Sequence, residues 1–116
     1  MRIPALFKQL QYIGRAKGDK STYHIFKGDL GYLVVAPNNR GGLNVNVVNL
    51  KIPDIILRKF RGREVTGPML AKRSGRPDLF RVPFVPLNSL YTMVGLGRAR
   101  KLSKHEGRAM VFKINR

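Results

Sequence analysis

The sequence contains no cysteine, few acidic residues and no long apolar run, and each absence excludes a class of protein. Without cysteine the chain forms no disulfides and no thiolate metal sites, and it has no thiol nucleophile. Its apolar runs fall far short of the roughly 20 residues that a membrane-spanning helix requires. No signal peptide is apparent, and the basic residues 1–18 lack the serines typical of organellar transit peptides. We therefore expect no membrane partner and an intracellular location: cytoplasm, nucleoid or nucleus, with an organelle as the alternative.

The scarcity of acidic residues leaves a large positive charge. The chain has 6 Asp and Glu against 23 Lys and Arg, a formal net charge of +17 at pH 7. This excess opposes compaction by self-repulsion, so a polyanionic partner is the simplest explanation. Residues 1–50 hold 7 bases and 2 acids (net +5), and residues 51–116 hold 16 bases and 4 acids (net +12). Anionic lipid is disfavoured, because no long segment combines a basic face with a large apolar one. The composition favours nucleic acid, met mainly by the second half of the chain.

The first half predicts a helix followed by an antiparallel sheet. The hydrophobic content of 43% is typical of a folded protein. Apolar side chains in residues 1–13 lie close to helical spacing, and the Gly-containing residues 14–20 are typical of a loop. From there the apolar period falls to two. This period predicts a three-stranded meander with strands over residues 22–27, 31–36 and 43–49.

The second half predicts helices and a terminal hairpin. Thr66 is a suitable N-cap, and Leu87, Leu90 and Val94 share one helical face. In chain order we expect helices over residues 53–61 and 66–72, an extended run over 79–85, a helix over 88–97 and a hairpin over 99–114. The predicted fold class is α+β. The chain divides into residues 1–50, a helix plus meander, and residues 51–116, a basic region, within one compact unit.

From residue 52 on, this order of elements resembles a winged helix-turn-helix, a DNA-binding superfamily. The resemblance rests on Thr66-Gly67-Pro68-Met69-Leu70-Ala71-Lys72 as the middle helix, on residues 88–97 as the recognition helix and on residues 99–114 as the wing. It covers the last 65 residues or so of the chain. The resemblance implies a helix placed at the major groove of duplex DNA and a wing against the backbone or the minor groove.

The residues predicted to bind nucleic acid are cations near helix ends and in the wing, together with three polar residues of the last helix. The cations are expected to contact phosphates, which position a protein without specifying sequence. The polar residues are expected on the outward face of the helix, where Asn pairs well with adenine. The set is Arg58, Lys59, Arg61, Arg63, Lys72, Arg73, Asn88, Ser89, Thr92, Arg98, Arg100, Lys101, Lys104 and Arg108. We expect salt-dependent, non-catalytic binding with duplex DNA preferred, in transcription regulation, genome architecture or the targeting of a larger system.

Two other functions stay open at this stage. A structural RNA-binding protein, such as a ribosomal component, fits the high pI of about 11.4 and the glycine-containing basic loop at residues 38–42. A metal-dependent endonuclease needs paired carboxylates, for which Asp54 and Glu64 are the available candidates. Asp54 also suits the N-terminal end of a helix. No catalytic residue is predicted.

Neither a metal site nor a cofactor is predicted. His24 and His105 are 81 positions apart and have no clustered acids beside them. The aromatic residues of the predicted sheet and of the segment before it either stack on bases or pack in the core, and core packing is the commoner outcome. They are Tyr12, Tyr23, Phe26 and Tyr32. Asn44 and Asn46 lie on the polar face of a strand, where they either contact bases or face solvent. The sequence leaves the oligomeric state open.

Overall fold

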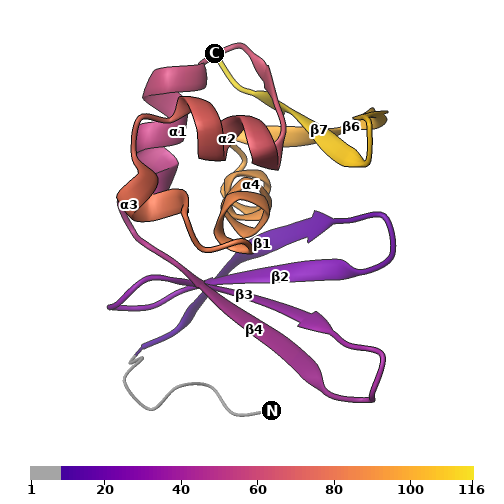
Figure 1. The fold of residues 1–116 in the computed structure, drawn as a ribbon. Helices are drawn as coiled ribbons and strands as arrows, with labels where there is room; N and C mark the ends of the chain where they lie inside the picture. Colours follow the sequence, from indigo (N-terminus) through magenta and orange to yellow (C-terminus); the bar gives the residue numbers. More distant parts are fainter. Residues whose placement is uncertain (1–8) are drawn as a thin grey trace.

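The computed structural model describes residues 9–116, in which two β-sheets lie on either side of one central helix (Figure 1). The first sheet consists of β1 (Gln11–Lys17), β2 (Thr22–Lys27), β3 (Tyr32–Pro37) and β4 (Leu43–Val48). The second, in spatial order, consists of β5 (Glu64–Val65), β7 (Ala109–Ile114) and β6 (Ala99–Glu106). The helices are α1 (Ile52–Phe60), α2 (Gly67–Arg73), α3 (Pro77–Phe80) and α4 (Val85–Gly95). This arrangement confirms the predicted α+β class.

The N-terminal sheet has four antiparallel strands, one more than predicted. The helix expected over residues 1–13 is wrong for residues 11–13, which belong to β1, and the rest of it lies largely outside the described residues. The loop predicted over residues 14–20 is also mostly strand. The glycine at position 14 was taken as a sign of a loop, but in the structure it allows β1 to lie close to the backbone of α4. A Cβ at Gly14 would lie 2.5 Å from the carbonyl oxygen of Gly95 in α4.

The helices α1 and α2 form where the sequence predicts them. In α2 the hydroxyl of Thr66 accepts a hydrogen bond from the backbone N–H of Met69 at 3.3 Å, as expected of an N-cap. The extended run predicted over residues 79–85 is wrong. Its first part belongs to α3, and α4 begins at Val85 rather than at Asn88. No helix within residues 9–116 is long and apolar enough to span a membrane.

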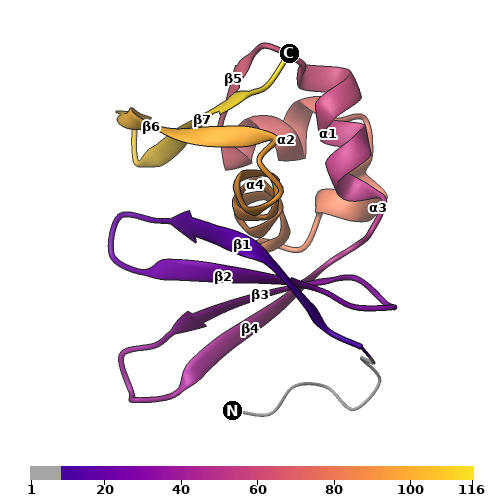
Figure 2. The ribbon, with the colours of Figure 1, turned by 180° about the vertical axis from the view of Figure 1, so that it is seen from behind.

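Helix α4 is the centre of the core, and both halves of the chain pack around it. The N-terminal sheet covers one side of it, and α1, α2 and the second sheet cover the other (Figure 2). Leu90 and Met93 are fully buried, as is Ile25 in β2. On β2, the ring of Tyr23 stacks on that of Tyr91 with 4.0 Å between centroids. The meander and the basic region therefore share one hydrophobic core.

The terminal hairpin forms as predicted, from β6 and β7, and extends into a three-stranded sheet. The short strand β5 pairs with β7 through Glu64 opposite Lys113 and Val65 opposite Phe112. The β6–β7 turn contains Gly107, whose φ of +63° is in the left-handed region that favours glycine.

Candidate nucleic-acid interface

The three polar residues predicted to face DNA from the last helix are buried instead. Asn88 is 7% exposed, and Ser89 and Thr92 are fully buried. Each side chain donates a hydrogen bond to a backbone carbonyl one helical turn earlier. The side-chain nitrogen of Asn88 donates to the carbonyl of Phe84 at 2.8 Å, and Ser89 Oγ donates to that of Val85 at 2.6 Å. Thr92 Oγ1 donates to the carbonyl of Asn88 at 2.9 Å. Short polar side chains satisfied in this way are compatible with a core. Helix α4 is therefore a core helix in this structure, and the three residues that were expected to reach the groove lie inside the core.

Three cations in or directly before the wing are held by carboxylates. Arg98 Nη1 lies 2.8 Å from Asp54 Oδ1 of α1, and Lys104 Nζ lies 2.6 Å from Glu64 Oε1 of β5. Lys101 Nζ lies 3.0 Å from Asp19 Oδ1, in the turn between β1 and β2. These pairs connect the hairpin and the residue before it to three other parts of the fold. Three of the predicted phosphate ligands therefore form ion pairs within the protein.

The same contacts stabilise the charged forms of the carboxylates. Beside its contact with Lys101, Asp19 has Nε2 of His105 within 2.8 Å of Oδ2, and the hydrogen bonds of His105 and then Lys101 hold the pKa of Asp19 below its usual value. The hydrogen bond from Lys104 likewise lowers the pKa of Glu64. Because these pairs lie at the surface, each adds little to stability. Their larger consequence is that, with the pairs of Asp54 and Asp78, four of the six acids of the chain are already matched with cations.

The remaining predicted cations are exposed and have no carboxylate within ion-pair distance among residues 9–116. They are Arg58, Lys59, Arg61, Arg63, Lys72, Arg73, Arg100 and Arg108. Two of them make other contacts: the guanidinium of Arg63 lies 5.7 Å from the ring centroid of Phe60, and Lys59 bonds a backbone carbonyl. Half of this set comes from the C-terminal turns of α1 and α2, where cations also suit the helix dipole.

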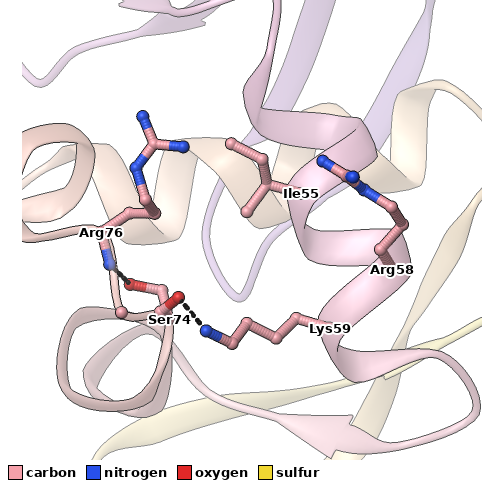
Figure 3. Close-up of a pocket in the computed structure, with 6 residues that line it drawn as sticks. Ile55, Arg58, Lys59, Ser74 and Arg76 are labelled. Carbon is pink, nitrogen blue, oxygen red and sulfur yellow. Dashed lines mark hydrogen bonds between the residues drawn. The ribbon is translucent and has the colours of Figure 1, made fainter.

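The ends of α1 and α2 meet around a hollow of about 340 Å³ that is lined by cations (Figure 3). Lys59 Nζ donates to the carbonyl oxygen of Ser74 at 2.5 Å, which joins the two helix ends. The guanidinium groups of Arg58 and Arg76 lie on either side of the Ile55 side chain in this view. We call the group Arg58, Lys59, Lys72, Arg73 and Arg76 the basic corner.

Sequence reasoning missed one member of the basic corner. Arg76 lines the hollow, although it also forms a two-point pair with Asp78 at 2.9 and 3.1 Å. The sequence held a signal for it, because Arg76 follows closely after the helix predicted over residues 66–72 and so had to lie near the end of that helix. Gly75 has a φ of +71°, and a Cβ there would lie 2.8 Å from Lys59 Nζ, so glycine suits the corner on both counts.

The structure brings together no group resembling a metal site. Within residues 9–116 no three His, Asp or Glu side chains are grouped so as to hold a metal ion. The two carboxylates considered for a nuclease, Asp54 and Glu64, are each paired with a wing cation. Of the aromatics considered for stacking, Tyr32 is buried and Tyr23 packs on Tyr91, so these two belong to the core. Tyr12, by contrast, is 50% exposed.

The chain matches no protein-family model, and no curated protein or solved structure is significantly similar to it.

Proposed function

We propose that the protein binds nucleic acid through the phosphate backbone, without catalysing a reaction, and that duplex DNA is its preferred form. The observation that carries this proposal is the basic corner. Two helices end at one place and expose four cations there that no carboxylate of residues 9–116 neutralises, and a hollow lies beside them. Phosphate oxygens are the ligands that such a cluster suits, and Arg binds them at two points.

Because α4 is buried, the binding that we propose depends on contacts to phosphates rather than to bases. A winged helix-turn-helix reads bases with its last helix, but here the matching residues are buried and bond to the backbone of their own helix. We keep the resemblance as a proposal about the order of elements: α1, α2 and α4 followed by a hairpin. Without a reading helix, phosphate contacts dominate, and such contacts distinguish sequences poorly. We therefore propose weak sequence preference and strong salt dependence.

Continuous stacking of a single strand is the less favoured mode. Proteins that follow single strands use several exposed aromatics as successive platforms. Among residues 9–116 the exposed large aromatics are Tyr12 and Phe84, and Tyr12 already packs on Phe26 with ring centroids 5.2 Å apart. Structured RNA is the second candidate, because the same exposed cations suit any paired backbone that is recognised by its shape.

A binding assay over a salt series tests the proposal. Equal lengths of duplex DNA, single-stranded DNA and hairpin RNA are titrated with the protein, and Kd is measured by fluorescence anisotropy. We expect duplex DNA to bind most tightly and its affinity to fall by decades as salt rises from about 50 to about 200 mM. Tighter binding to hairpin RNA at every salt concentration would favour the second candidate, and no binding to any probe would refute both.

A further inference from the structure

A cleft of about 270 Å³ lies between the edge strand β4 and helix α4, apart from the basic corner. Its apolar part includes Val34 and Ala36 of β3, and its polar part includes Asn44 and Asn46 of β4 with Asn88 of α4. No charged side chain of residues 9–116 lines it. Its volume is near the small end of the range for ligand pockets, roughly 300 Å³ and above.

Two of the three amide groups in the cleft, those of Asn44 and Asn46, are free to bind a ligand. Asn44 and Asn46 pair across the ladder with Ala36 and Val34, whose side chains face α4, so both amides lie on the helix side of the sheet. Neither amide bonds to another side chain or to the backbone within residues 9–116. The side-chain nitrogen of Asn88 is engaged with the carbonyl of Phe84. An amide offers a donor and an acceptor side by side, the pattern that pairs with the edge of adenine.

An aromatic ring stands at the rim of this cleft. Phe84 is 69% exposed, more than any other large hydrophobic side chain among residues 9–116. It lines the cleft and two adjoining hollows of about 320 and 330 Å³ along β4. Exposed aromatics of this kind stack on unpaired bases. Arg81, three residues earlier, is also exposed and has no ion-pair partner among residues 9–116, so a cation for the adjoining phosphate is near in the chain.

We propose that this cleft binds one unpaired nucleobase, with adenine preferred, stacked on Phe84 and hydrogen-bonded by Asn44 and Asn46. The inference rests on the proposed function, since the base belongs to the nucleic acid held by its phosphates. An extended peptide added to β4 is a poorer occupant, because it would bond to the strand's backbone edge and leave unused the amides that face α4. A second copy of the chain is a poorer occupant for the same reason, because it would offer the amides of Asn44 and Asn46 no paired donor and acceptor.

Three DNA probes of one sequence test this inference: fully paired, with a single bulged adenine, and with an abasic residue in place of that adenine. Kd is measured by fluorescence anisotropy at one salt concentration. We expect the adenine bulge to bind about 5- to 100-fold more tightly than the abasic probe, the range that stacking of one base provides. Phe84→Ala should remove this difference and leave the Kd of the paired probe unchanged. Leu30→Ala, at an apolar side chain that is 54% exposed in the β2–β3 turn, is the matched control and should keep the difference.

A bulged thymine separates hydrogen bonding from stacking. Asn46→Leu should reduce the preference for adenine over thymine while both bulges still bind more tightly than the abasic probe. Equal affinity for the bulged and abasic probes, with paired DNA still bound, would overturn this inference alone. Failure of all three probes to bind would refute the proposed function as well. If wild type elutes as a dimer in size-exclusion chromatography and Phe84→Ala as a monomer, a second copy occupies the cleft and the inference is wrong.

Discussion

Substituting Gly14 with alanine tests whether the N-terminal sheet is closed over α4. A Cβ at this position would lie 2.5 Å from the carbonyl oxygen of Gly95 and 3.3 Å from its carbonyl carbon. Both groups are backbone, so no flexible side chain can yield. Strand β1 and helix α4 must therefore separate, which loosens contacts along their whole interface.

The expected cost follows from packing. Forcing extra atoms into a close-packed contact costs about 1–3 kcal/mol, and the alanine recovers about 0.4–1 kcal/mol by restricting the unfolded chain. A net loss of about 1.3 kcal/mol in the free energy of unfolding should lower Tm by about 4–7 °C in a domain of this size. The same loss should lower the urea midpoint by about 1 M.

Gly67→Ala is the matched control for this prediction. A Cβ at Gly67 would lie 3.7 Å from its nearest neighbours, an ordinary contact, and Gly67 is in the first turn of α2. This variant should be as stable as wild type or slightly more stable. If Gly14→Ala unfolds at the same temperature as wild type, the sheet does not lie against the α4 backbone, and the argument that α4 is a core helix fails.

Three further predictions concern pH and capping. The lowered pKa of Asp19 means that its pairing with His105 stabilises the fold above the ordinary carboxyl pKa of 3.8 and is lost as pH falls through the lower folded value. Asp19→Asn should therefore lose less stability than wild type between about pH 5 and pH 2 in urea unfolding. Thr66→Ala removes the cap on Met69 and should cost about 1 kcal/mol in the same assay. Burial, and next the nearby Tyr23, raises the pKa of Tyr91, so its tyrosinate absorbance should appear only above the ordinary tyrosine range, or on alkaline unfolding.

The elements with local signals were predictable from the sequence. The N-cap at Thr66 and the alternating apolar residues of the hairpin act between near neighbours, and the structure places both as expected. The role of Gly14, by contrast, could not be predicted from its neighbours in the sequence. Its nearest contact is Gly95, 81 positions away in the chain, and only the assembled fold shows that the glycine serves packing rather than a loop.

The candidate site was predictable in its composition but not in its geometry. A polar residue in a helix was taken as outward-facing, yet Ser89 and Thr92 satisfy their hydroxyls against their own helix, which leaves no trace in the apolar spacing. The pairing of Arg98 with Asp54 spans 44 positions, so a count of basic residues could not show that this charge is already matched.

The salt dependence of duplex DNA binding by an Arg58→Gln variant tests the central claim most directly. Each phosphate contact contributes about 0.9 to the slope of log affinity against log salt concentration. We predict that Arg58→Gln lowers the slope by about 1, whereas Arg15→Gln does not change it. Arg15 is also exposed, but its neighbour Ala16 packs in the core, so Arg15 lies on the face of the sheet turned away from α4. Equal slopes for wild type and both variants, or binding that does not respond to salt, would contradict the account.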